Sequence, residues 1–501
     1  MKNILRNILI MKTNDKDVFY KGRRTMIRWG IIGAGRIAHR FVAALQNETD
    51  SQLYAISCRT QDKADAFACQ YGNIKAYAGF DHIVNDPDVD AVYISVPHAY
   101  HKEWIIQCLK AGKPVLCEKP LCLSEEEVDE VIAVSRQTGV LCMEALKTRF
   151  VPLYDEIRKT IENGTIGKIV GVDTSLCSLA DLSRTDLYYL NPTGGGALLD
   201  EGIYNAGWIE DYAPHDLKMT SIKAVYRDGV DLYTDACLEE NGFRVRLECA
   251  FDRKKEKKAV LHGTKGSITV YDLHRPVKAE VISHNEHRYI MEKPYVYDDF
   301  YGQIHHFVQL IRQGRKESDV VPLSVSKNCA RILDTIRKGY SYDEKAVQLL
   351  ERQEEVLQYA SFDYNGAWML VKTILDLQKD YDRNISVSVF DEDQQLEIIR
   401  VLQDGKTEAN LKYMNGKRSS AISCGHSSLY AYVAAVTSGH QPVFNETYCS
   451  SGGAFPIRIN GKWKYTVTVS GLHEGGDHEI IIKALEIILK RKTDPFPYMM
   501  V

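Results

Sequence analysis

The chain has 501 residues, more than the roughly 250–300 at which one hydrophobic core stops growing, so two or more domains are expected. Its 45% apolar and 26% charged residues are those of an ordinary globular protein, and a net charge of −4 gives no reason to expect nucleic acid or an anionic membrane as a partner. No run of about 18 apolar residues occurs, which excludes a predicted membrane-spanning helix.

The twelve cysteines are scattered and form no Cys-x-x-Cys pair or zinc spacing. We therefore expect reduced, mostly buried thiols in a cytoplasmic protein, and no metal site. Residues 1–25 are expected to be a flexible N-terminal extension, and whether they belong to the mature protein stays open.

Residues 26–145 alternate predicted strands and helices. Strands are expected at 27–32, 53–57, 91–96, 115–117 and 140–143, and helices at 36–46, 62–71, 100–111 and 124–138. Ser124 followed by Glu127 is a capping box that opens the last helix. This alternation is typical of an α/β fold with a doubly wound parallel sheet.

Residues 146–345 are predicted to form an α+β substrate and oligomerisation domain with a large, mainly antiparallel sheet. Its strands are expected at 166–176, 221–227, 235–238, 243–251, 258–261 and 267–271, with a loop at 178–193 and helices at 300–312 and 324–338. Residues 346–355 are predicted to be a charged, helix-friendly linker.

Residues 356–501 can bury a core of their own and are expected to form a separate, smaller α/β sandwich-type domain. Helices are predicted at 364–379, 393–404, 427–437 and 478–489, and strands at 385–390 and 463–470.

A glycine turn follows the first predicted strand. Gly33, Gly35 and Ala38 fit the pattern Gly-x-Gly-x-x-Ala at the start of a helix. Gly33 permits the tight turn, Gly35 lets the backbone approach a pyrophosphate, and Ala38 allows helix and strand to pack closely. We expect this turn, together with Arg36 and Ile37, to bind a dinucleotide.

The second strand is followed by Arg59, not by the acid that usually binds the ribose 2′-hydroxyl. An arginine suits a 2′-phosphate, so the sequence favours NADP, with NAD as the alternative.

A lysine follows the predicted strand at 115–117, within Glu118-Lys119-Pro120. At the carboxyl end of a parallel strand, Lys119 could donate to a carbinol oxygen and stabilise alkoxide charge. Asp200 and Tyr204 follow three glycines and are four residues apart, so one helix would place both on one face. We predict Tyr204 as general acid and base, with a pKa lowered by Lys119, and Asp200 as an orienting group.

These strings resemble the Gfo/Idh/MocA oxidoreductase family, especially its dihydrodiol dehydrogenase and xylose dehydrogenase-like branch. Residues 29–38, 95–98 with 101, 115–121, 143–145 with 148–150, and 194–204 carry the resemblance, which extends over 26–345. It implies a Rossmann domain, catalytic roles for Lys119, Asp200 and Tyr204, and a cis bond before Pro120. The implied cofactor contacts, beyond the glycine turn and Arg59, are Pro97, His101, Glu118, Lys119 and Arg149. It also implies a homodimer or homotetramer formed through the open sheet.

Lys147 departs from the aromatic residue usual in that branch. We expect it to point to solvent. The alternative is a cation near the nicotinamide that favours acidic or phosphorylated substrates.

Residues 356–501 resemble a different family, the haem-degrading-domain or GlcG-like proteins, through 417–418 with 424–428, 452–458, and 469–472 with 477–479. His426, His473 and His478 are candidate iron ligands, but a haem also needs an apolar slot. Haem is therefore a disfavoured ligand of this module. The alternative is a small anion or small molecule bound at the glycine-rich turn.

The leading interpretation is an oxidoreductase that prefers NADP and transfers a hydride between nicotinamide and a carbinol carbon of a sugar, cyclic polyol or diol. One alternative is an NAD-dependent glycoside-cleaving enzyme that oxidises its sugar transiently. Another is a nucleotide- or haem-binding sensor without turnover. The C-terminal module would be an accessory or binding domain.

Overall fold

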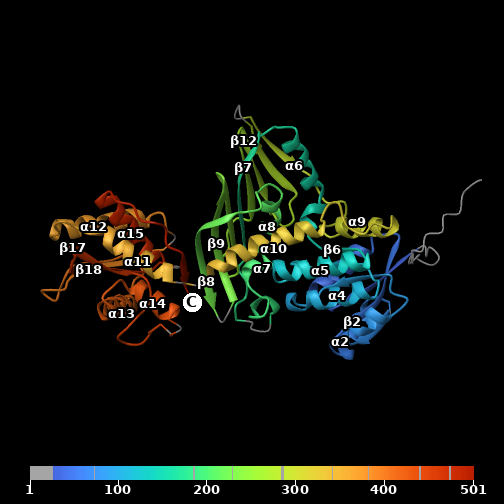
Figure 1. Cartoon of the computed structure of the whole chain (residues 1–501), viewed down its shortest axis with the longest axis horizontal. Coiled ribbons are helices and arrows are strands. Elements are labelled where there is room, and N and C mark those ends of the chain that lie inside the picture. Colours follow the sequence, from blue (N-terminus) through green and yellow to red (C-terminus); the bar gives the residue numbers. More distant parts are fainter. Residues whose placement is uncertain are drawn as a thin grey trace, which may run out of the picture.

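The computed structural model describes residues 26–72, 74–183, 187–227, 230–283, 287–340, 342, 344–381, 383–438, 440, 442–472 and 475–500. The predicted extension at 1–25 and the candidate ligand His473 lie outside these residues. Three sheets follow one another along the chain, and Figure 1 shows the nine-stranded sheet between the other two parts.

The first sheet is parallel and six-stranded, in the order β3-β2-β1-β4-β5-β6. Its strands are β1 (Ile27–Ile32), β2 (Ser51–Cys58), β3 (Lys75–Ala78), β4 (Ala91–Ile94), β5 (Val115–Cys117) and β6 (Cys142–Glu144). The helices are α1 (Arg36–Leu45), α2 (Gln61–Gln70), α3 (Asp81–Asn85), α4 (His101–Lys110) and α5 (Glu125–Thr138). The doubly wound α/β prediction is confirmed, and the strand order reverses between β1 and β4, where such sheets bind ligands. The sequence analysis missed the short edge strand β3.

The second sheet has nine strands in the order β14-β13-β12-β11-β7-β10-β9-β8-β19. They are β7 (Ile169–Cys177), β8 (Lys218–Arg227), β9 (Val230–Glu240), β10 (Phe243–Ala250), β11 (Lys258–Gly263), β12 (Gly266–Tyr271), β13 (Lys278–Ile282), β14 (Arg288–Glu292) and β19 (Tyr498–Met500). The β7–β10 and β8–β19 pairs are parallel and the other neighbours antiparallel, so the sheet is mainly antiparallel, as predicted.

Helices connect this sheet to the first. They are α6 (Pro152–Glu162), α7 (Ala197–Asp200), α8 (Gly202–Glu210), α9 (Tyr301–Arg312) and α10 (Leu323–Arg337). One continuous hydrophobic core includes Trp29 of β1, Trp208 of α8 and Phe307 of α9, and the rings of Trp29 and Phe307 are 5.5 Å apart. Because the core is shared, the two sheets hold a fixed position relative to each other.

The C-terminal module has a four-stranded antiparallel sheet in the order β16-β15-β18-β17. Its strands are β15 (Ser386–Asp391), β16 (Leu396–Leu402), β17 (Ala454–Ile459) and β18 (Lys462–Ser470), and its helices are α11 (Glu344–Val356), α12 (Tyr364–Gln378), α13 (Glu408–Cys424), α14 (Ser428–Thr437) and α15 (Gly476–Leu489). The helix predicted at 393–404 is wrong, because these residues form a turn and the strand β16.

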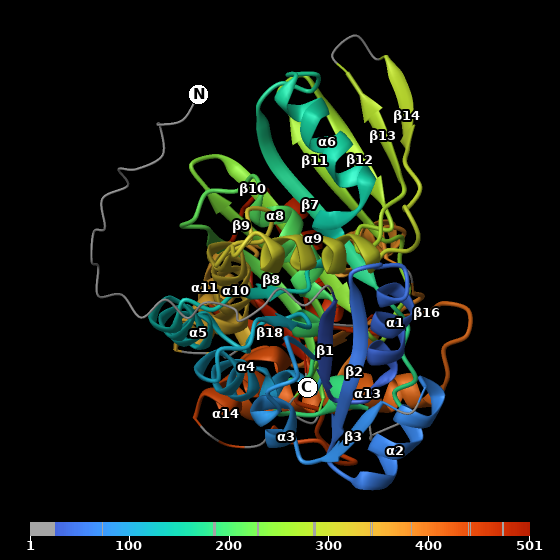
Figure 2. The ribbon, with the colours of Figure 1, turned by 90° about the vertical axis from the view of Figure 1, so that its right-hand side faces the viewer.

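The end of the chain joins the second sheet. Strand β19 pairs with β8, and Lys223 of β8 donates to Glu479 of α15 at 2.8 Å. Ala224 of β8, Leu350 of α11 and Tyr498 of β19 share a buried cluster with residues of α14. The module therefore docks on the side of the sheet away from the six-stranded domain (Figures 1 and 2).

Every cysteine is a free thiol and most are buried, as expected. None of the helices in the described part of the chain combines the length and apolarity that a bilayer crossing requires.

Candidate active site

The glycine turn after β1 leaves room for a ligand at the start of α1. Gly33 has φ +100°, and a Cβ there would lie 2.9 Å from the carbonyl oxygen of Ser95. Gly35, by contrast, is exposed and would bring a Cβ near only that oxygen, at 3.8 Å. No side chain caps the first turn of α1, while Ala38 is fully buried against the sheet. The open N–H groups and the free approach at Gly35 fit a dinucleotide pyrophosphate.

The other residues predicted to face the cofactor from this side are accessible. Arg36, Arg59 and Pro97 are exposed and Ile37 is half-buried. Arg59 directly follows β2 and is followed by Thr60, so no carboxylate occupies the end of this strand.

Lys119, after β5, and Asp200, at the end of α7, form a buried ion pair. Lys119 Nζ donates to Oδ1 of Asp200 at 2.7 Å and to its carbonyl oxygen at 2.6 Å. Burial alone would lower the pKa of Lys119, but the charge of Asp200 raises it well above its usual value. Burial likewise would raise the pKa of Asp200, yet the charge of Lys119 lowers it. Both groups are therefore charged at neutral pH.

Tyr204 lies over the same lysine, with its ring centroid 4.8 Å from Lys119 Nζ. The single helix predicted for Asp200 and Tyr204 is wrong. It breaks at Glu201, so Asp200 ends α7 and Tyr204 belongs to α8. The predicted lowering of the pKa of Tyr204 is also wrong, because burial outweighs the charge of Lys119 and raises it. Tyr204 is a protonated phenol.

Two residues absent from the predicted site contact Asp200. Tyr188 donates to Oδ1 at 3.1 Å from the loop before the glycines, and Nε2 of His98 lies 3.7 Å from the same oxygen. Burial lowers the pKa of His98 to about 3, so its ring is neutral. His98 was visible in the sequence beside Pro97, whereas nothing in the loop sequence distinguished Tyr188.

Glu201 brings a second carboxyl close to this ion pair. Burial, followed by the charge of Asp200, raises the pKa of Glu201 to about 7, while Lys119 and Lys257 oppose the shift. The site therefore holds one carboxyl that changes charge near neutral pH.

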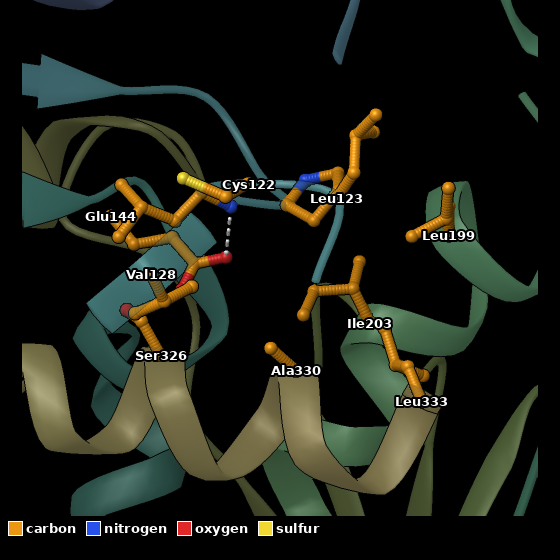
Figure 3. A pocket seen from close by; sticks show the side chains of 11 residues that line it. Cys122, Leu123, Val128, Glu144, Leu199, Ile203, Ser326, Ala330 and Leu333 are labelled. Atoms are coloured by element: carbon orange, nitrogen blue, oxygen red, sulfur yellow. Dashed lines mark hydrogen bonds between the residues drawn. The ribbon is translucent and has the colours of Figure 1, made fainter. Parts of the chain in front are cut away.

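Buried side chains fix the turn that carries Lys119. Its peptide bond to Pro120 is cis, as the resemblance implied. Tyr93 donates to Glu118, which is buried, and Oε1 of Glu144 accepts from the backbone N–H of Leu121 at 3.0 Å. Figure 3 shows Glu144 next to Ser326 at a cavity of about 10 Å³, the size of one water. Oε2 of Glu144 and Oγ of Ser326 have no hydrogen-bond partner among the described residues.

His101 also stabilises this turn. It is completely buried, and its ring nitrogens lie 2.8 Å from the carbonyl oxygen of Pro120 and 2.9 Å from that of Val96. The predicted cofactor contact at His101 is therefore corrected to a structural link between the ends of β4 and β5.

Two further cations are buried in ion pairs of the protein itself. Arg149 contacts Glu210 at 2.5 Å and Asp211 at 2.7 Å, so its predicted cofactor contact is corrected as well. Lys147 is 5% exposed and pairs with Asp299, which contradicts the expectation that it points to solvent.

The three glycines before Asp200 are required by the protein's own packing. A Cβ at Gly195 would lie 2.5 Å from the carbonyl oxygen of Asn191, and one at Gly196 would lie 2.0 Å from Asp231.

In the C-terminal module, the two described histidines proposed as iron ligands each contact another side chain of the protein. Nδ1 of His426 lies 3.1 Å from Glu354, and Nε2 of the buried His478 lies 3.1 Å from Oε1 of Gln353. In the described part of the chain, no three His, Cys, Asp or Glu side chains gather as a metal site would require.

Known protein families match all three parts. Residues 27–146 match the model described as "Oxidoreductase family, NAD-binding Rossmann fold", and residues 154–269 match the "GFO/IDH/MocA C-terminal domain". Residues 362–486 match "Haem degrading protein HbpS-like".

Curated relatives and solved structures agree with the first two matches. Trans-1,2-dihydrobenzene-1,2-diol dehydrogenase of Mus musculus is 33% identical and that of Homo sapiens 30%, each over 62% of this chain and 96% of the relative. A 3-ketoreductase from Actinomadura kijaniata, solved in complex with NADP and TDP-benzene, is 27% identical with a TM-score of 0.57 and covers 62% of this chain and 97% of its own. Levoglucosan dehydrogenase, at 21% identity and a TM-score of 0.55 over 62% and 96% of the two chains, shares the fold.

Proposed function

Because the chain belongs to the Gfo/Idh/MocA family of NAD(P)-dependent oxidoreductases, we propose that it reduces a carbonyl, or oxidises the matching carbinol, on a sugar, cyclic polyol or diol. The observation that carries this proposal is the buried contact of Lys119 with Asp200 beside Tyr204, at the end of the sheet that bears the glycine turn. The names of the relatives, a diol dehydrogenase and a 3-ketoreductase, support the substrate class.

The nicotinamide cofactor, when bound, supplies or accepts the hydride. Lys119 donates a hydrogen bond to the substrate oxygen and stabilises the negative charge that grows there during reduction. Tyr204 is protonated at neutral pH, since burial raises its pKa, and transfers its phenolic proton to this oxygen. Asp200 keeps Lys119 charged and, with Tyr188, fixes where its ammonium group lies.

The exposed Arg59 supports NADP as the preferred cofactor. Its guanidinium would pair with the 2′-phosphate, which NAD lacks. The substitution R59A should raise the KM for NADPH about tenfold or more, because a hydrogen bond to a charged group contributes about 1.5–3 kcal/mol. The KM for NADH should stay within about twofold of wild type. Equal changes for both cofactors would contradict the assignment.

The C-terminal module leaves part of the outer face of the nine-stranded sheet open, around the exposed Arg244 and Arg246, and this open face supports a homodimer or homotetramer. On this face, away from α8, Arg246 pairs with Asp235 at 2.8 Å. Sedimentation of the R246E variant tests this interface: a smaller particle than wild type is expected, and an unchanged one would rule the interface out.

The substrate class is tested by following NADPH and NADH absorbance over a panel of keto sugars, sugars, cyclic polyols and diols. Turnover is expected with at least one carbonyl–carbinol pair, and the K119A variant should lose it. The variant K110A, which changes an exposed lysine on α4, is the matched control. A panel without turnover, or wild-type rates in K119A, would overturn the proposal.

A further inference from the structure

The chain covers two of its sheet edges and leaves the edge strand β16 open. Strand β19 pairs with β8 at one end of the nine-stranded sheet. In the C-terminal module, Tyr359 bridges to Ile459 at the edge strand β17, where its N–H donates to the carbonyl oxygen of Arg458 at 3.0 Å. At the opposite edge, β16 pairs within the described chain with β15 alone. An unpaired edge of this kind is a template for another strand.

Large apolar side chains surround this open edge. Leu396 and Leu402, at the ends of β16, are 54% and 45% exposed. Helix α12 packs against β15 and β16, and its outer face presents Tyr364, Trp368 and Met369 at 62%, 51% and 55% exposure. Leu402 lies opposite Ser386 and so points to the other face of the sheet, whereas Leu396 lies on the face that α12 covers. Leu396, Tyr364, Trp368 and Met369 are called the β16–α12 surface. A surface that joins exposed aromatic residues to an open strand is typical of a protein interface.

The charges on β16 identify the partner. Glu397 and Arg400 form an ion pair within the strand. A bulge at Ile398 in β16 turns Glu397 and Arg400 to the same face of the sheet. If a second β16 pairs antiparallel so that Ile398 of each copy lies opposite Ile399 of the other, Glu397 of each copy lies opposite Arg400 of the other. Opposite charges directly across an antiparallel pair are stabilising, and like charges are destabilising. The strand is therefore complementary to itself in the arrangement that a twofold axis generates.

We propose that the β16–α12 surface binds the same surface of a second copy of this chain. The two four-stranded sheets then form one continuous eight-stranded sheet, and the two α12 helices lie on the same face of it, one from each copy. This interface is separate from the open face of the nine-stranded sheet and does not depend on the proposed catalysis.

Charge reversal tests the pairing between copies. In R400E, two glutamates of each copy face two glutamates of the other, and in E397R two arginines face two arginines. Each variant alone should raise the dissociation constant of this contact about tenfold or more in sedimentation experiments with the full-length chain. An equal mixture of the two variants should restore association, because both cross-strand pairs are then opposite in sign. Rescue by mixing cannot arise from contacts within one chain.

Two further variants complete the experiment. W368K should weaken the same association from the helix side. R352E reverses an exposed arginine of α11 that also pairs with a glutamate three residues away, and it should sediment as wild type. Circular dichroism checks that each variant is folded. Wild-type association in both R400E and E397R, a mixture that fails to restore it, or a monomeric wild-type chain would overturn the proposal.

Discussion

Burial and charge act in opposite directions on Lys119 and Asp200, and the contact between them decides both protonation states. Each group alone would tend to lose its charge in this environment, but at 2.7 Å each stabilises the charge of the other. The sequence was enough to predict that Lys119, Asp200 and Tyr204 form the site and lie close together. It could not predict the pKa of Tyr204, because the degree of burial depends on how α8 packs.

Glu201 is predicted to make stability depend on pH. Its pKa is raised from about 4.5 to about 7 in the folded protein, so its stabilising effect is fully present below pH 4.5 and is lost as pH rises through 7. The E201Q variant avoids the buried charge, so its Tm should exceed that of wild type by about 2–6 °C at pH 8.5. The two should differ little at pH 4.5. A Tm difference of the same size at both pH values would refute this assignment.

Glu144 is predicted to position the turn that carries Lys119. Burial raises its pKa, and its free oxygen lies with Ser326 at the water-sized cavity (Figure 3). E144Q keeps both an acceptor for Leu121 and a donor toward Ser326, so kcat should stay near wild type. E144A removes the contact with the turn and should lower kcat about tenfold, the effect of losing one buried hydrogen bond. The KM for NADPH should not change, because the glycine turn is untouched. Equal losses in both variants would contradict this positioning role.

At the scale of elements, the apolar pattern predicted most strands and helices but failed where one residue changed the backbone. Leu396, Ile399 and Leu402 have a helix-like spacing, which produced the wrong helix. The structure turns before them, since Asp391 accepts from the N–H groups of Asp393 and Gln394, and Gln395 has φ +53°. The β-branched residues that follow then form the second strand of a hairpin.

Helix α13 was not predicted, for a different reason. It covers a sheet face made of hydroxyl residues, including Ser388 and Thr468, whose oxygens are 2.7 Å apart. Its own buried side is polar or small as well, with Lys417, Ser420 and Ala421. A helix without an apolar stripe shows no helical periodicity in its hydrophobic residues, so the sequence pattern does not predict it.

The pairing of β19 with β8 is predicted to hold the C-terminal module against the nine-stranded sheet. Tyr498 is 5% exposed and packs in the cluster between β8, α11 and α14. The Y498A variant should loosen β19, so the backbone amides of β8 near Lys223 should exchange hydrogen faster than in wild type. Y448A, at a tyrosine that is 37% exposed, is the control. Unchanged exchange in β8 would show that the strand pairing does not contribute to docking.

For the whole molecule, the order of the three parts and their fold classes could be predicted from alternating patterns, because each part repeats its own period over many residues. The attachment of the last strand to the middle sheet could not. Tyr498 and Lys223 are far apart in sequence, and a three-residue strand carries too little pattern to reveal its partner. The tail therefore links the C-terminal module to the oxidoreductase half in a way that only the fold reveals.

The central claim is that the Lys119 site transfers a hydride between nicotinamide and a substrate carbon. It is tested most directly with NADPH that carries deuterium at both C4 positions of the nicotinamide and with the carbonyl substrate found in the panel. The product should carry one deuterium on the new carbinol carbon, and K119M should form it at least about a hundredfold more slowly, the cost of losing one group that stabilises an oxyanion. A product without deuterium, or an equal rate in K119M, would contradict the account.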